Sequence, residues 1–179
     1  LIPRAMAGMM LAHLGVAVFI FGVTLVRHYE VERDVKMDRG DQTTVAGYTF
    51  RFLGVRSFEG PNYTAWQAGV QVERDGRPER LMLPEKRIYK VQSNPMTEAA
   101  IDTGLTRDLY VSLGEPLENS DAWIVRVYVK PFVDWIWGGC LLMALGGLLA
   151  ATDRRYRQGA RERRAAPAAT DLTAQGQAA

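Results

Sequence analysis

The chain of 179 residues is long enough for one ordinary domain, or for a small domain together with membrane segments, and its sequence begins at Leu1, which leads us to expect a piece of a longer protein. Its formal net charge of +2 is the sum of a basic C-terminal stretch and a mildly acidic middle, so the charge pattern excludes a nucleic-acid-binding footprint. A single cysteine, Cys140, excludes an intrachain disulfide and any CxxC chemistry.

The first predicted element is a membrane-spanning helix over residues 5–26. This run carries no charge, and a bilayer core about 30 Å thick needs ~20 helical residues to cross it. A cleaved signal peptide is the alternative, but its apolar core is typically about 7–15 residues long, and no convincing A-x-A cleavage site follows this run. Arg27, His28 and Tyr29 then mark the outer boundary of the span.

A series of short strands follows the first span. Residues 48–55 (YTFRFLGV) alternate apolar and polar side chains at period two and end before the turn residues 60–62. Asp75-Gly76 lies between two extended runs and predicts a hairpin. Residues 108–114 and 122–129 repeat the period-two pattern. Closely spaced strands with turn residues between them predict a small antiparallel barrel or sandwich.

The stretch NPMTEAAIDTGL is the expected exception. Asn94 or Thr97 would cap a short helix there, stabilised by packing on the sheet. Glu98 and Asp102 would then be four residues apart and share one helical face. An enzyme built on these carboxylates is the weaker interpretation, since no base, metal or nucleophile is near, and a solvated or strand-capping role is favoured.

Residues 132–152 form the second predicted span. Lys130, Trp135 and Trp137 resemble an interfacial anchor, in which indole rings lie at headgroup level and the lysine reaches outward. Small and flexible side chains follow one side of this helix and favour helix packing over a cofactor site. They are Gly139, Met143, Gly146, Gly147 and Ala150.

Charge placement predicts the orientation of the chain. The stretch TDRRYRQGARERR follows the second span, and positive residues beside a helix end stay in the cytoplasm. Residues 27–131 are therefore expected outside the cytoplasm, and residues 153–179 form a basic, disordered cytoplasmic tail. The predicted fold class is a membrane protein of the α+β type, in which two transmembrane helices flank an extracytoplasmic antiparallel β-rich domain.

His13 is the one ionisable side chain inside the first span. An ionisable residue at this depth indicates a functional site, and helical spacing places it on a face with Met6, Met9, Ala17, Ile20 and Thr24, with Gly8, Ala12 and Gly15 close by. Small residues would let another helix or a flat ligand approach. The residues alone leave two alternatives open: a haem axial ligand, or an interhelical hydrogen bond.

Most other chemistry is excluded by the histidine count. His28 is 15 residues from His13, about 22 Å along one helix, so the two cannot share a metal. No histidine follows His28, which excludes a Ser-His-acid set and a histidine-rich metal site in the outer domain.

Four strings over residues 5–157 resemble the C-terminal portion of the CcmF family, the haem lyase component of cytochrome c maturation in bacteria and plant mitochondria. They are LAHLGVAVFIFGVTL, GPNYTAW, LPEKRIYKVQSNPMTEAAIDTGLTRDLYVSLGEPL and AWIVRVYVKPFVDWIWGGCLLMALGG. The most specific parts are PMTEAAID, RDLYV and the KPFV-WIW segment.

The resemblance implies a multi-pass protein of the bacterial inner membrane, with residues 27–131 in the periplasm. It implies that His13 is one of two axial ligands to a b-type haem, the other lying on an upstream helix absent from this chain. The family's tryptophan-rich haem-handling segment is absent too, so we expect this piece alone not to attach haem. The implied partners are the haem chaperone CcmE, CcmH, CcmI, apocytochrome c and membrane lipids, and no catalytic residue is assigned. The alternative is a non-catalytic membrane scaffold that docks cytochrome c assembly partners.

Overall fold

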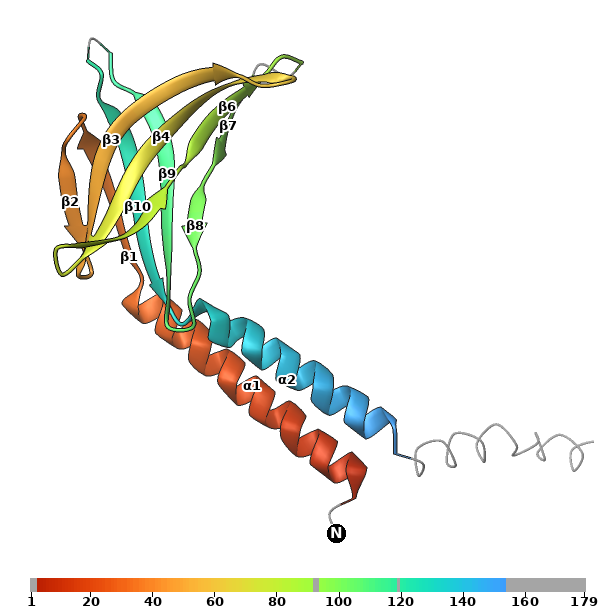
Figure 1. The fold of residues 1–179 in the computed structure, drawn as a ribbon. Coiled ribbons are helices and arrows are strands. Elements are labelled where there is room, and N and C mark those ends of the chain that lie inside the picture. The colour runs from red at the N-terminus through yellow and green to blue at the C-terminus, as the bar shows by residue number, and fades with distance from the viewer. Residues whose placement is uncertain (1–2, 92–93, 119, 154–179) are drawn as a thin grey trace, which may run out of the picture. The chain divides into compact units, whose positions relative to one another are not determined.

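The structure, a computed structural model, describes residues 3–91, 94–118 and 120–153. Within this part the chain forms two helices and ten strands, with the strands between the helices in sequence (Figure 1). It divides into two compact units. A helical unit contains the chain up to Phe19 and from Gly138 onward, and a β unit runs from Ile20 to Trp137. The predicted tail lies outside the described residues except for Asp153.

The larger sheet of the β unit is antiparallel, with the strand order β2-β3-β4-β6-β7 and with β5 also paired to β4. These strands are β2 (Gln42–Val45), β3 (Tyr48–Glu59), β4 (Tyr63–Arg74), β5 (Arg77–Met82), β6 (Glu85–Tyr89) and β7 (Pro95–Glu98). The predicted strand at residues 48–55 is confirmed as the first part of β3, and the break at residues 60–62 separates β3 from β4.

The smaller sheet has the antiparallel order β1-β10-β9-β8. Its strands are β1 (Val31–Met37), β8 (Ala100–Asp102), β9 (Arg107–Pro116) and β10 (Trp123–Pro131). The predicted strand at residues 108–114 lies within β9, and the one at residues 122–129 begins one residue before β10 and covers most of it. β1 pairs with β10 along its whole length, from Val31 opposite Val129 to Met37 opposite Trp123.

The hydrophobic core of the β unit draws on both sheets. Because side chains alternate between the two faces of a strand, every second residue is buried in the first part of β3 and in the middle of β10. Phe50 and Phe52 of β3 are fully buried, as are Leu109, Val111 and Leu113 of β9, and all five belong to one cluster of buried residues. Two antiparallel sheets that bury side chains in a shared core form a sandwich, which selects between the two predicted all-antiparallel alternatives.

The hairpin predicted at Asp75-Gly76 is confirmed. These two residues join β4 to β5, and both have positive φ angles, 51° and 72°. Two successive left-handed residues are the signature of the tight turn that matches strand twist, and Gly76 adopts this conformation without a Cβ clash.

The short helix predicted within NPMTEAAIDTGL is wrong. Pro95–Glu98 forms β7 at an edge of the larger sheet, and Ala100–Asp102 forms β8 at an edge of the smaller sheet. An edge strand suits Pro95, which has no N–H to donate. Pairing with β6 and β9 satisfies the backbone of this segment in place of a helical turn. Glu98 and Asp102 therefore belong to different sheets and share no helical face.

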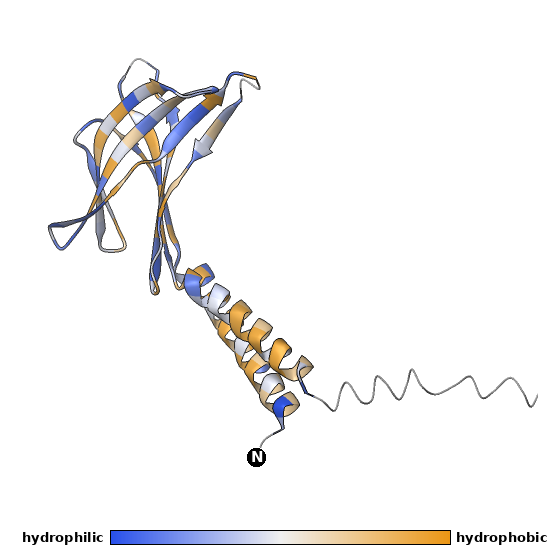
Figure 2. Cartoon of the chain, turned by 45° about the vertical axis from the view of Figure 1, so that its right-hand side comes forward, coloured by the Kyte–Doolittle hydropathy of each residue, from blue (hydrophilic) through white to orange (hydrophobic). Residues whose placement is uncertain are grey.

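Both predicted spans are helices. α1 covers Arg4–Tyr29 and α2 covers Val133–Ala151, and both are long and apolar enough to cross a membrane. Figure 2 shows apolar residues along most of both helices, with hydrophilic residues near the ends of α1.

The helices of the helical unit pack with their backbones in close contact. A Cβ added to Gly15 of α1 would lie 2.6 Å from the backbone nitrogen of Met143, and one added to Gly146 of α2 would overlap the backbone of Ala12. A Cβ added to Gly147, the next residue, would have no neighbour within 4 Å. The small residues predicted to line one side of α2 therefore do pack against a helix, apart from Gly147.

Candidate functional site

The imidazole ring of His13 lies on an exposed face of α1 and is oriented by its own helix. Its Nδ1 lies 2.8 Å from the backbone oxygen of Met9, one turn earlier. A carbonyl oxygen only accepts hydrogen bonds, so this contact places the proton on Nδ1 and leaves the lone pair of Nε2 free. A neutral imidazole whose other nitrogen donates to a carbonyl is the usual form of a metal-ligating histidine. His13 can therefore offer one ligand atom.

The face of α1 around His13 is apolar and exposed. Met6, Met9 and Ile20 are each about half exposed, at 50%, 51% and 57%. Thr24 donates its hydroxyl to the backbone oxygen of Ile20 at 2.8 Å, so its polar group is satisfied within the helix. Helical spacing correctly predicted that these residues share one surface with His13.

The small residues of α1 do not lie beside His13. Gly8 and Gly15 are buried against α2, and Gly15 follows His13 by two positions, which places these two residues about 160° apart around the helix axis. Of the two roles expected for these glycines, the structure shows the approach of another helix: α2 packs on them, so their face is not open to a flat ligand. The small residue on the same face as His13 is Ala17, which is exposed.

The described residues contain no group of three or more His, Cys, Asp or Glu side chains placed to hold a metal. His28 lies at the other end of α1, with its ring edge-on to that of Tyr29 at 4.8 Å between centroids.

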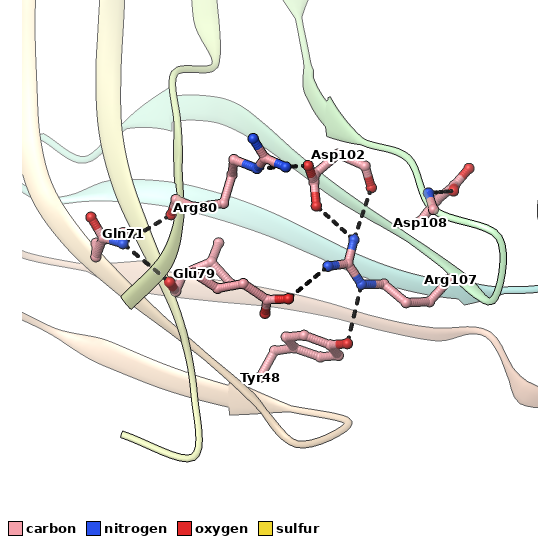
Figure 3. A network of polar contacts seen from close by, with 9 residues as sticks. Tyr48, Gln71, Glu79, Arg80, Asp102, Arg107 and Asp108 are labelled. Atoms are coloured by element: carbon pink, nitrogen blue, oxygen red, sulfur yellow. Dashed lines mark hydrogen bonds and ion pairs between the residues drawn. The ribbon is translucent and has the colours of Figure 1, made fainter. Parts of the chain in front are cut away.

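A network of polar side chains centred on Arg107 connects the two sheets (Figure 3). The guanidinium nitrogens of Arg107 lie 2.6 Å from Oδ2 of Asp102, 3.2 Å from Oε1 of Glu79 and 3.1 Å from the hydroxyl of Tyr48. Arg80 adds a second contact to Asp102, at 2.9 Å. Arg107 and Asp102 belong to β9 and β8 of the smaller sheet, whereas the other three residues belong to the larger sheet.

The charge of Arg107 is held in place by its neighbours. Burial opposes the charged form, but the hydrogen bonds of Asp102 and Tyr48 outweigh it and raise the pKa of Arg107 above its ordinary value. Such a guanidinium cannot exchange protons at neutral pH, so the network serves to join the sheets. Sequence reasoning assigned Arg107 no role, because its partners come from strands far apart in the chain.

The carboxylates singled out in the sequence are paired with arginines. Glu98 lies 3.6 Å from a guanidinium nitrogen of Arg87, and Asp102 is engaged by Arg80 and Arg107. An acid catalyst would need a carboxyl group whose pKa is raised and whose proton can reach a substrate. Paired carboxylates in separate sheets fit the structural role that the sequence favoured.

Asp108 is the buried carboxylate of this region. It begins the buried part of β9 and accepts a hydrogen bond from the backbone N–H of Gly104 at 3.2 Å. Burial raises the pKa of Asp108 above its usual value, although the hydrogen bond from Gly104 opposes this shift. Asp108 therefore orders the loop between β8 and β9.

The residues predicted to anchor the second span lie at the end of β10 and in the first turns of α2. Trp137 is exposed at 67% and Trp135 at 40%. The indole N–H of Trp135 donates to the backbone oxygen of Leu105 at 3.1 Å, and the ammonium group of Lys130 lies 4.7 Å from the ring centroid of Tyr128. The level of these residues in a bilayer stays a prediction.

Comparison with known proteins gives one consistent family. The family model described as the CcmF C-terminal beta-sandwich matches residues 28–131, which contain all ten strands. The cytochrome c-type biogenesis protein CcmF of Pseudomonas aeruginosa is 57% identical over 87% of this chain and 24% of its own length. CcmF of Escherichia coli K12 is 52% identical over 90% of this chain and 25% of its own length.

The chain spans about a quarter of the length of the curated relatives that it matches. A solved structure, that of cytochrome c heme lyase CcmF, superposes with a TM-score of 0.68 over 82% of this chain and 24% of the solved chain. It is 23% identical, so this likeness shows the fold alone. Since the family model covers more than half of its length, the chain belongs to the CcmF family, of which it contains the C-terminal β-sandwich.

Proposed function

We propose that this chain is part of a haem-handling protein of cytochrome c maturation, and that His13 supplies one axial ligand to a b-type haem within the membrane. The observation that carries the proposal is the exposed imidazole of His13, with Nδ1 bound to Met9 and Nε2 free, in a helix that is otherwise apolar. Membership of the CcmF family supports the same process, because the curated relatives are named as cytochrome c-type biogenesis proteins.

The residues around His13 fit one face of a haem. The exposed side chains of Met6, Met9 and Ile20 provide apolar contacts for a porphyrin, and Ala17, one turn after His13, leaves room beside the imidazole for a flat ring. A bound haem would supply a redox-active iron. The task of this chain would be to hold and orient it: the carbonyl of Met9 fixes the ring of His13, whose Nε2 would hold the iron, and a second ligand would come from another segment of the longer protein.

We infer that α1 and α2 cross the bacterial inner membrane, that residues 27–131 lie in the periplasm, and that the C-terminus is cytoplasmic. The hydropathy and length of both helices support the crossings, and the arginines that follow α2 in the sequence support the orientation. In this arrangement the sandwich is available to the haem chaperone CcmE, to CcmH and CcmI, and to apocytochrome c.

Two variants of His13 test the proposal in cells. His13→Ala in the full-length protein should abolish or strongly reduce cytochrome c formation, with the protein still present in the membrane at its normal level. His13→Asn should fail equally, because an amide can donate and accept hydrogen bonds but does not replace imidazole as an iron ligand. Normal cytochrome c formation by both variants would refute the ligand role.

A second candidate function is a scaffold that docks assembly partners without binding haem itself. A surface groove of about 940 Å³ on the β unit favours it. Leu53, Leu81 and Leu83 line the groove and are 44–50% exposed, beside Arg39 and Arg56. Exposed apolar residues with a basic rim are typical of interaction surfaces. Function retained in His13→Asn, together with function lost in Leu81→Asp, would favour this candidate.

A further inference from the structure

We propose that residues 103–106, the loop between β8 and β9, enter the lipid interface beside the first turn of α2, with Leu105 as the inserted side chain. This Leu105 loop would be a third membrane contact of the chain, in addition to α1 and α2. The inference rests on the proposed membrane crossing of the two helices.

Leu105 is a large apolar residue that is highly exposed. Its side chain is 78% exposed, whereas Asp108 and Leu109, at the start of β9, are buried. A single exposed leucine is common on soluble proteins, so exposure alone would not indicate a lipid contact. The lipid contact is indicated by the link between this residue and the start of α2.

Two hydrogen bonds tie the Leu105 loop to the start of α2. The indole N–H of Trp135 donates to the backbone oxygen of Leu105 at 3.1 Å, and the backbone N–H of Phe132 donates to the oxygen of Thr106 at 3.0 Å. Phe132 has a φ of +60°, which a bulky residue rarely adopts, and its ring packs edge-on against Trp135 at 5.6 Å. The loop is therefore held at the same depth, measured along the helices, as Phe132 and Trp135.

The contacts of Trp135 with α1 give the depth of that level. Its ring lies 5.9 Å from that of Phe21, and Phe21 precedes the first charge after the apolar run, Arg27, by about 9 Å along the helix. If α1 crosses the membrane, Arg27 lies at or outside the headgroup boundary. Trp135 then lies on the lipid side of that boundary, and the loop bonded to its indole comes with it.

The backbone of the loop can also be transferred from water to the lipid interface at low cost. Backbone carbonyls without partners are costly in lipid, but that of Leu105 already accepts a hydrogen bond from Trp135 of α2, and that of Thr106 accepts one from Phe132, just before α2. Gly104 donates to Asp108, and its own oxygen accepts from the backbone N–H of Arg107 at 3.2 Å, so the turn is ordered before it meets a membrane. Little conformational entropy would be lost on insertion.

Lipid is the occupant that this surface fits best. The loop offers one large apolar side chain between two threonines, which is too little for a stable protein interface. It is bonded to Trp135, whose indole is 40% exposed, and exposed indoles are typical of the bilayer interface. The expected contact is thus with the outer part of the acyl chains.

Site-directed fluorescence in the full-length protein tests the inference. In a background without other reactive cysteines, including Cys140→Ala, a cysteine replaces Leu105 and carries an NBD label, and the protein is placed in phosphatidylcholine nanodiscs. Nitroxide on the upper acyl chain should quench most of the emission, and aqueous iodide should quench little. Val91→Cys is the matched control, since Val91 is 92% exposed in the turn after β6; its label should respond to iodide and not to the lipid nitroxide.

A label at Leu145, on the exposed side of α2, separates this inference from the membrane crossing on which it rests. Lipid quenching at position 145 without lipid quenching at position 105 would refute insertion of the Leu105 loop and leave the membrane crossing intact. Absence of lipid quenching at both positions would refute the crossing as well. Quenching by neither agent at position 105 would mean that protein covers the loop, which also overturns the inference. Because the label itself is apolar, a photoactivatable lipid should also modify Leu105 in unlabelled protein, and absence of that product would count against insertion.

Discussion

Substitution of Gly146 by alanine is expected to force α1 and α2 apart. The added Cβ would overlap the backbone of Ala12 and would lie 2.6 Å from the backbone oxygen of Gly8, whereas ordinary contacts lie at 3.4–4 Å. The shortfall is about 1 Å, and because both neighbours are backbone atoms no side-chain rotation can relieve it. Overpacking of this kind typically lowers the free energy of unfolding by about 1–3 kcal/mol.

Gly147→Ala is the matched control for this substitution. It changes the same residue type one position later in α2, where no atom lies within 4 Å of the added Cβ. The gain in helix propensity should leave stability unchanged or raise it by up to about 1 kcal/mol. SDS titration in mixed micelles, followed by tryptophan fluorescence, would compare the free energies of unfolding. Equal effects of the two variants, or no loss in Gly146→Ala, would refute the close packing of the helices.

The remaining predictions concern the β unit. Arg107→Ala should lower the free energy of unfolding by about 2–3 kcal/mol, because it removes the main partner of the partly buried carboxylate of Asp102, while Arg51→Ala, at the surface, should lower it by no more than about 1 kcal/mol. Urea titration of both variants measures this, and similar losses would contradict the bridging role of Arg107. For Asp108, burial raises the pKa in the folded protein, so its contribution to stability is fully present below the usual value of 3.8 and is lost as the pH rises through the raised value. Asp108→Asn keeps an acceptor for the Gly104 N–H and should flatten the dependence of Tm on pH above 3.8; an unchanged slope would exclude Asp108 as the source.

The elements with a strong periodic signal could be predicted from the sequence. Residues 48–55, 108–114 and 122–129 alternate because one face of each strand lies in the core, and Asp75-Gly76 carries its own turn signal. The apolar spans were equally clear. These features depend on residues that are close together in the sequence, so they can be predicted without knowing which segments pack against them.

β1 had no such signal, because it is an edge strand with little burial. Four of its seven residues are charged, and most of its side chains are exposed. Its place is secured by cross-strand contacts with β10: both guanidinium contacts of Arg126 to Asp34 measure 2.6 Å, and the hydroxyl of Tyr128 donates to Glu32 at 2.6 Å. Such pairs depend on register, which the sequence of β1 does not contain.

The helix prediction for the segment that forms β7 and β8 was wrong for a related reason. The local signals at Asn94 and Thr97 are real capping preferences, but the backbone partners supplied by β6 and β9 decided the outcome. The candidate functional residues also fall into one that the sequence could predict and a group that it could not. His13 was found because an imidazole in an apolar span is conspicuous by itself, whereas the network of Arg107 is assembled from four strands and leaves no pattern in the sequence.

The central claim is that His13 ligates a b-type haem, and the optical spectrum of the purified full-length protein tests it most directly. The wild-type protein should show the reduced spectrum of a low-spin haem with two histidine ligands, and His13→Ala should lose the haem or convert it to a high-spin form. His28→Ala, which removes the other histidine of α1, should leave the spectrum unchanged. An unaltered low-spin spectrum and haem content in His13→Ala would contradict the account.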